Sequence, residues 1–138
     1  MKRLISLLSV IALLTSCTFY DTDSTDVVHL SVNTHDWQVN LDPANSIPLY
    51  YSYTFAMPEI TAQLYEDGLV QTYMVFDGAQ QALPYVQHFQ GTDGITKWDW
   101  TRTIDCRYAA GELTVFVTNS DFVNDLPESM NFRVVLIK

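Results

Sequence analysis

Apolar and polar residues alternate along most of the chain from residue 27 onward. A period of two places successive side chains on opposite faces of an extended strand. The longest alternation runs over residues 98–108, where Trp98, Trp100 and Cys106 share one face with polar side chains between them. Because no strand–helix–strand rhythm is present, the pattern predicts an all-β fold.

The spacing of the alternating segments indicates how the strands are arranged. Seven or eight short strands within residues 27–138 are typical of an antiparallel two-sheet sandwich of immunoglobulin-like size, with a closed barrel as the alternative. Asp77-Gly78, between the apolar residues 69–76 and 81–89, predicts a hairpin with a type I′ turn. Pro84 in the second arm predicts an edge strand or a bulge, because proline cannot donate to a sheet ladder.

Two short features depart from the strand pattern. Residues 60–68 fit one or two helical turns, with Thr61 as the N-terminal cap and Gly68 as a left-handed stop. Arg102 interrupts an otherwise apolar face, which predicts a bulge or a sheet rim at that position.

Composition and charge bound the function. The chain has 138 residues, 48% of them hydrophobic and 17% charged, which is typical of one globular domain. Sixteen acidic residues against seven Lys and Arg give a formal charge of -9. A charge of this sign repels phosphate backbones and argues against nucleic-acid binding.

The first residues have the layout of a targeting signal. Lys2 and Arg3 precede an apolar run at residues 4–14, which is too short to cross a bilayer as a helix. A basic start followed by about 7 to 15 apolar residues is typical of a secretory signal peptide. We therefore exclude residues 1–16 from the predicted fold.

The tetrapeptide Leu14-Thr15-Ser16-Cys17 resembles the lipobox of bacterial lipoproteins. The resemblance implies cleavage before Cys17 and attachment of acyl chains, palmitate among them, to this residue. More than one chain makes membrane anchoring stable where a single chain is marginal. The alternative is ordinary cleavage that releases a soluble protein with Cys17 as a thiol.

Residues 17–26 are acidic and rich in Ser and Thr, and they predict a flexible tether. Loss of Lys2 and Arg3 with the signal would leave five basic residues against sixteen acidic ones. An acidic stretch directly after the lipidated Cys is similar to the export signals of Bacteroidota surface lipoproteins. A plain spacer explains the composition equally well.

A second resemblance covers residues 57–137. The order Met57-Pro58-Glu59-Ile60-Thr61, then Gly68, then Leu83-Pro84-Tyr85 and a final FRVVLI resembles a group of small uncharacterised Bacteroidota lipoproteins. The resemblance implies the same architecture and a cell-envelope location, with the outer membrane as the expected site. It implies no active-site residue.

The motifs of several enzyme classes are absent from the sequence. No serine lies in a Gly-x-Ser-x-Gly elbow, and the pair Gly91 and Gly94 lacks the spacing of a phosphate-binding loop. His29, His35 and His88 are not clustered as zinc ligands are. We expect no catalytic residue, no cofactor and no metal, and we expect Cys106 to be an inert core thiol.

Carboxylates are numerous enough to form pairs by chance. Glu66-Asp67 lies before a glycine, where acidic residues commonly serve turns. Asp121, Asp125 and Glu128 could offer oxygen ligands to Ca²⁺, but their spacing is not that of a calcium loop. A solvated loop is the favoured interpretation.

Aromatic residues are the most suggestive excess in the composition. Core packing is the favoured interpretation of Trp98 and Trp100, because they share a face with apolar residues. Three other aromatic residues lie opposite the expected core faces and are candidate contacts for a sugar ring or a partner protein. They are Tyr50, Tyr73 and Phe116.

These observations favour a non-catalytic lipoprotein of the cell envelope that binds a glycan, a peptide or another envelope protein. One alternative is a small extracytoplasmic hydrolase, directed at glycans, that uses a pair of carboxylates. A second alternative is a structural subunit of a surface filament, which would present an unpaired edge strand or a groove that accepts a donor strand.

Overall fold

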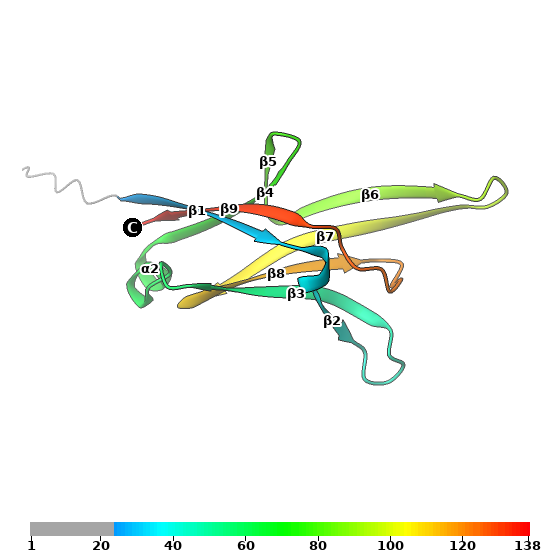
Figure 1. Ribbon diagram of the computed structural model, residues 1–138, viewed down its shortest axis with the longest axis horizontal. Helices are drawn as coiled ribbons and strands as arrows, with labels where there is room; N and C mark the ends of the chain where they lie inside the picture. Colours follow the sequence, from blue (N-terminus) through cyan, green and yellow to red (C-terminus); the bar gives the residue numbers. More distant parts are fainter. Residues whose placement is uncertain (1–23) are drawn as a thin grey trace, which may run out of the picture.

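The computed structural model describes residues 24–138, which form two antiparallel β-sheets packed face to face (Figure 1). One sheet has the strand order β1-β9-β4-β5 and the other β2-β3-β8-β7-β6. The predicted all-β sandwich is confirmed, with nine strands among the described residues. The strands are β1 (Thr25–Val32), β2 (Gln38–Leu41), β3 (Pro48–Met57), β4 (Leu69–Phe76), β5 (Ala79–Ala82), β6 (Tyr85–Thr92), β7 (Lys97–Ala109), β8 (Gly111–Asn119) and β9 (Met130–Ile137).

The core lies between the inner faces of the two sheets. Strand β8 lies inside one sheet and β9 inside the other, and alternate side chains of both are fully buried. Burial of a large aliphatic side chain stabilises the fold by about 1.5–3 kcal/mol. The central buried residues of these two strands are Leu113, Val115, Val117, Phe132, Val134 and Leu136.

Two short helices complete the fold: η1 (Thr34–Asp36) and α2 (Ala62–Asp67). The predicted cap of α2 is confirmed, because the backbone N–H of Leu64 donates to Oγ1 of Thr61 over 3.1 Å. The predicted left-handed stop is wrong, since Gly68 has an extended backbone with φ of -102°. A Cβ at residue 68 would lie 2.7 Å from the carbonyl oxygen of Ile137, so close packing accounts for this glycine.

The predicted turn at Asp77-Gly78 is confirmed, with φ of 49° and 76°, the positive values of a type I′ turn. The predicted single arm over residues 81–89 is wrong. Strand β5 pairs with β4, the chain then changes sheet at Leu83–Pro84, and β6 continues in the other sheet. The change falls at Pro84, which has no N–H to continue the ladder.

The first and last described residues lie side by side at one end of the sandwich (Figure 1). The backbone N–H of Lys138 donates to the carbonyl oxygen of Ser24 over 3.1 Å, and its ammonium pairs with Asp26. Strand β1 begins at Thr25, so the last two residues of the expected tether, residues 17–26, belong to the sheet. The expected signal peptide and Cys17 lie outside the described residues. Neither short helix of residues 24–138 has the length and the apolar sequence of a membrane-spanning helix.

Candidate binding surface

The hairpin formed by β6 and β7 extends beyond the rest of the sandwich (Figure 1). Strand β7 pairs with β6 from Lys97 to Ile104, but its ladder with β8 begins only at Arg102. The tip, residues 92–97, lies at the end of the molecule opposite Ser24 and Lys138. The outer part of the hairpin is therefore a two-stranded ribbon without a sheet packed against its inner face.

This overhang corrects the expectation that Trp98 and Trp100 pack in the core. Trp98 is 47% exposed and Trp100 is half-buried, although both lie on the same face as buried Ile104. The alternation identified the face correctly, but the opposite sheet ends before it reaches these two residues. Trp37, in contrast, is 5% exposed, and its indole N–H donates to the carbonyl oxygen of Glu128 over 3.1 Å.

Phe89, Trp98 and Trp100 form the aromatic face of the hairpin. The rings of Phe89 and Trp100 are stacked across the two strands, with centroids 5.1 Å apart and planes inclined by 11°. Trp98 lies opposite Gly91, and a Cβ at residue 91 would come within 2.5 Å of the indole ring. The indole therefore lies directly against the backbone of β6, which leaves about half of its surface open to solvent.

Polar groups surround the base of the aromatic face. The guanidinium of Arg102 lies 5.4 Å from the centroid of the Phe89 ring and bonds to the Glu128 carboxylate at 2.8 and 3.0 Å. Its Nε donates to Oδ1 of Asn119 over 3.0 Å. The register with β6 runs without a shift through residue 102, and the ladder with β8 begins at this residue, so Arg102 lies at a rim and not at a bulge.

A hollow of about 250 Å³ opens beside this rim, between the end of β4 and the base of β6. Gln87 and Glu128 contribute polar groups to its wall, and the remaining lining is mostly apolar. The other lining residues are Met74, Val75, Phe76, Ser129 and Met130. The aromatic face thus leads from the exposed tip of the hairpin to a small pocket with an amide and a carboxylate.

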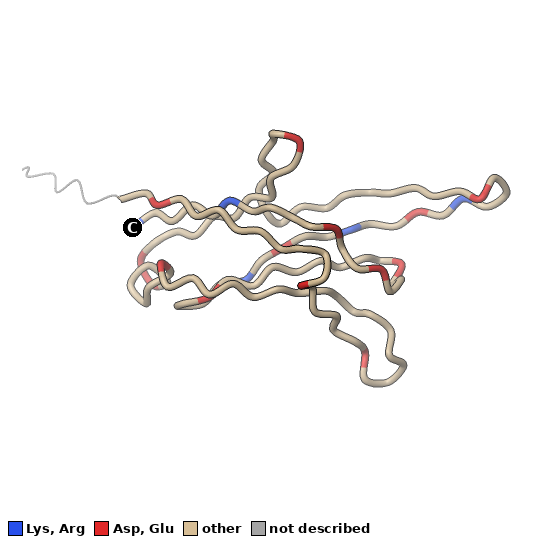
Figure 2. The backbone as a smooth tube through the Cα atoms, viewed as in Figure 1, with Lys and Arg blue, Asp and Glu red and all other residues tan. Residues whose placement is uncertain are grey.

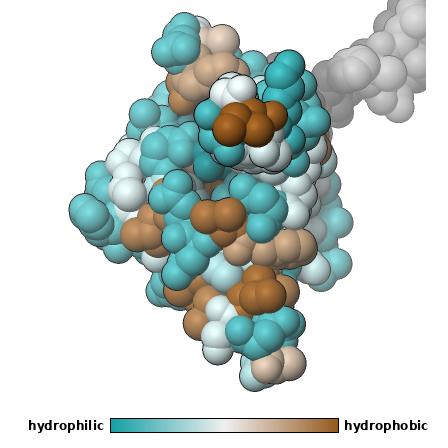
Figure 3. All heavy atoms as spheres, turned by 90° about the vertical axis from the view of Figure 1, so that its right-hand side faces the viewer, coloured by the Kyte–Doolittle hydropathy of each residue, from teal (hydrophilic) through white to brown (hydrophobic). Residues whose placement is uncertain are grey.

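Further hydrophobic side chains lie at this end of the molecule. Figure 3 shows them separated by hydrophilic side chains over the surface seen from the hairpin end. Ile95 at the hairpin tip is 95% exposed. Ile47, Leu49 and Phe122 line a second hollow together with two polar residues. The end away from Ser24 and Lys138 therefore exposes several large apolar side chains.

The three aromatic candidates from the sequence do not come together. Tyr50 and Phe116 lie on the outer face of the five-stranded sheet, in an edge-to-face contact with centroids 5.7 Å apart. Arg107 lies 5.2 Å from the Phe116 ring, and Arg133 lies 5.8 Å from the ring of Tyr73 on the other sheet. All three candidate rings are half-buried beside these neighbours, so they offer less open surface than Trp98.

Cys106 is half-buried against the core, and burial raises the pKa of its thiol. A raised pKa reduces the reactive thiolate at neutral pH. Residues 24–138 contain no group of three or more His, Cys, Asp or Glu placed to hold a metal ion. Glu128 is instead engaged by Arg102, and Oδ1 of Asp121 accepts a bond from the backbone N–H of Val123 over 3.3 Å.

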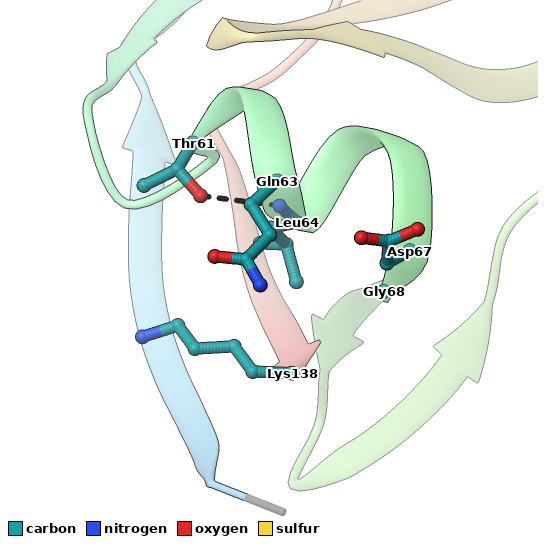
Figure 4. Close-up of a pocket in the computed structure, with 6 residues that line it drawn as sticks. All are labelled: Thr61, Gln63, Leu64, Asp67, Gly68 and Lys138. Carbon is teal, nitrogen blue, oxygen red and sulfur yellow. Dashed lines mark hydrogen bonds between the residues drawn. The ribbon is translucent and has the colours of Figure 1, made fainter.

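The hollow beside α2 has a volume of about 190 Å³ (Figure 4). It lies at the opposite end of the molecule from the tip of the β6–β7 hairpin (Figure 1). Thr61 uses its hydroxyl for the helix cap, and the ammonium of Lys138 pairs with Asp26 outside the hollow. Asp67 is its only carboxylate side chain.

Four hollows are described in residues 24–138, and each is lined by one acidic side chain. None of these four therefore holds the two carboxylates that the hydrolase hypothesis needs.

No protein-family model, curated protein or solved structure matches this chain.

Proposed function

We propose that the protein is a lipid-anchored, non-catalytic binding module of a bacterial cell envelope that recognises a glycan through the aromatic face of its β6–β7 hairpin. The anchor is proposed at Cys17, on the sequence evidence of an apolar leader and a lipobox-like tetrapeptide. An outer-membrane location is proposed on the resemblance of residues 57–137 to small Bacteroidota envelope lipoproteins.

The geometry of the domain supports such an arrangement. The chain enters the sandwich at Ser24, beside Lys138, while the hairpin tip projects from the opposite end (Figure 1). A tether that ends at residue 24 would hold the aromatic face away from the membrane. The ligand-binding surface would then be presented to molecules outside the lipid layer.

The single observation that carries the proposal is the open indole of Trp98. An aromatic ring that is exposed and held flat is a rigid apolar surface, and its ordering cost on binding is small because the backbone at Gly91 already fixes it. A pyranose ring has one apolar face and a polar rim. Gln87, Arg102 and Glu128 at the base of the aromatic face supply the hydrogen-bonding groups that such a rim requires.

A glycan array tests the proposal, probed with the intact protein extracted in mild detergent. We expect retention of the wild-type protein on a subset of oligosaccharides and a loss of about tenfold or more in affinity with Trp98→Ala. Tyr65→Ala is the matched control, because Tyr65 is a 48% exposed aromatic residue on α2 that packs against Tyr108, at the other end of β7 from Trp98. Its binding should equal that of the wild-type protein.

Two outcomes contradict the proposal. One is a folded wild-type protein that binds no oligosaccharide on the array. The other is a Trp98→Ala variant that binds as well as the wild-type protein does. Retention of an envelope protein that Trp98→Ala abolishes, without any glycan binding, would instead assign the aromatic face to a protein partner.

A further inference from the structure

The four edge strands of the two sheets differ in how they are protected against pairing with another strand. Strands β2 and β5 have four residues each, and β2 has a register shift at Asn40 and Leu41. Strand β1 carries Asp26, which is paired with Lys138. Short length, irregularity and charge are the devices by which proteins prevent edge-to-edge association.

Strand β6 has none of these devices. Its eight residues, YVQHFQGT, include no Asp, Glu, Lys, Arg or proline. Its register with β7 runs without interruption from Tyr85 to Thr92, and among the described residues β7 is its only partner strand. Figure 2 shows this strand free of Lys, Arg, Asp and Glu, although the chain as a whole is acidic. Strand β6 is thus a long, regular and uncharged edge.

The hydrogen bonds of β7 show which backbone groups this edge offers. The backbone N–H of Ser120 donates to the carbonyl oxygen of Thr101, so Thr101 bonds toward β8. Adjacent residues of a strand bond to opposite sides, and Trp100 and Arg102 therefore bond toward β6. Their partners, Phe89 and Gln87, use their backbone groups within the hairpin. The remaining backbone groups point outward, and they belong to Val86, His88, Gln90 and Thr92.

We infer that β6 pairs in antiparallel fashion with β6 of a second copy of this chain, around a two-fold axis at Phe89. In this register Val86 lies opposite Thr92 of the other copy, and His88 lies opposite Gln90. All four outward-facing residues are then hydrogen-bonded, and each such pair exchanges two bonds. The two five-stranded sheets become one continuous sheet.

Three features favour a second copy as the occupant. Like charges do not face each other along the seam, because β6 has no Asp, Glu, Lys or Arg and His88 lies opposite Gln90. The two Phe89 side chains form a close, non-hydrogen-bonded pair on the inner face, which continues the Phe89–Trp100 stack across the axis. The hairpin projects beyond the sandwich, so the pairing brings two ribbons together and keeps the two sandwiches apart. A two-fold interface of this kind closes as a dimer.

Cysteine cross-linking in cells that express two differently tagged full chains tests both the pairing and its register. Directly opposed hydrogen-bonded residues have Cα atoms about 5.5 Å apart, which is within disulfide range. We expect His88→Cys in one chain and Gln90→Cys in the other to give a disulfide-linked dimer of twice the monomer mass. The yield should exceed that of either variant alone by about tenfold or more, since pairing raises the effective concentration of the two thiols.

The matched control pairs His88→Cys with Thr101→Cys. Thr101 lies opposite His88 within one hairpin and on the same outer face, but it belongs to β7, one strand away from the proposed seam. This pair should cross-link between chains no more than the wild-type chain does. The test needs no ligand, so its result is independent of glycan binding.

Three results would overturn the inference. One is a His88→Cys and Gln90→Cys yield no higher than the control yield, with all variants shown to melt as the wild-type protein does. Another is equal cross-linking of either single variant alone, which would indicate random collision or another register. The third is an adduct with a protein of different mass, which would assign the edge to a foreign strand.

Discussion

At the scale of single residues, Trp98 and Gly91 depend on each other. Residue 91 faces the indole across the two strands of the hairpin, and any Cβ there would overlap the ring. The backbone of Gly91 does not have a positive φ, so space and not backbone conformation requires the glycine.

Neither Phe89 nor Gly91 is singled out by the alternation of the sequence. The pairing register of the hairpin was the signal that would have placed both beside Trp98.

Gly91→Ala should therefore have opposite effects in two backgrounds. With Trp98 present, we expect destabilisation by about 1 kcal/mol or more, because the indole must leave its place. In a Trp98→Ala background we expect stabilisation by about 0.5–1 kcal/mol, since alanine restricts the unfolded chain. Urea unfolding of the four proteins gives the coupling energy. Equal effects of Gly91→Ala in both backgrounds would refute the contact.

Asp105 gives a prediction about pH. Its carboxylate lies on the outer face of β7, opposite Phe116 of β8, and burial raises its pKa above the ordinary value of 3.8. A raised pKa in the folded state means that the protonated form stabilises the fold. This contribution is complete below the ordinary pKa and is lost as pH rises through the pKa of the folded protein.

Asp105→Asn should accordingly stabilise the protein at neutral pH, and the gain should shrink as the pH falls toward 3.8. Urea unfolding curves of the variant and the wild-type protein, recorded at intervals of about half a pH unit between about pH 3.5 and about pH 7, measure the difference. A stability difference that does not change over this range would show that Asp105 does not titrate as described.

At the scale of elements, local signals predicted more than long-range ones. The cap at Thr61 and the turn at Asp77-Gly78 were predictable because both depend on a few neighbouring residues. The division of the second hairpin arm into β5 and β6 could not be predicted. Apolar and polar residues alternate in the same way whether a chain stays in one sheet or crosses to the other. Pro84 marked the place without indicating which sheet the chain would enter.

The cap of α2 can be tested directly. Thr61→Ala should destabilise the protein by about 1 kcal/mol, because the N–H of Leu64 loses its acceptor at the start of a six-residue helix. Thr61→Ser keeps the hydroxyl and should cost only a few tenths of a kcal/mol. Thermal and urea unfolding distinguish the two variants. Equal destabilisation by both would assign the effect to the lost methyl group and not to the cap.

The overhang of the β6–β7 hairpin was the element that sequence reasoning missed. Alternation reports which side chains share a face, but burial also requires a second sheet of matching length. Strand β7 has thirteen residues, whereas each strand of the opposite sheet has eight or fewer. The aromatic face is open because of this difference in length, and the difference appears only when both sheets are assembled.

At the scale of the whole molecule, the two ends of the sandwich have different characters. One end holds Ser24 and Lys138, where the proposed tether joins the fold. The other end carries the aromatic face, the exposed Ile95 and the hollow near Phe122. Acidic residues of the described part lie mainly in loops, turns and the two short helices, and strand β6 has none (Figure 2). Such a division suits the proposed binding module, which would be anchored at one end and would contact its ligand at the other.

The anchor itself is tested at Cys17. We expect Cys17→Ala to abolish fatty-acid labelling and to move the protein out of the membrane fraction, because the proposed acyl chains would supply the membrane affinity. Cys106→Ala is the matched control, and it should leave both labelling and fractionation unchanged. Labelling or membrane association that persists in Cys17→Ala would reject lipidation at this residue.

The central claim is that Trp98 lies open on a projecting hairpin, and collisional quenching of tryptophan fluorescence by acrylamide tests it most directly. The chain has three tryptophans, of which Trp37 is buried and Trp100 half-buried. We predict that Trp98→Phe removes most of the readily quenched emission and shifts the remaining emission to shorter wavelength. Quenching and emission that are the same in Trp98→Phe and in the wild-type protein would contradict the account.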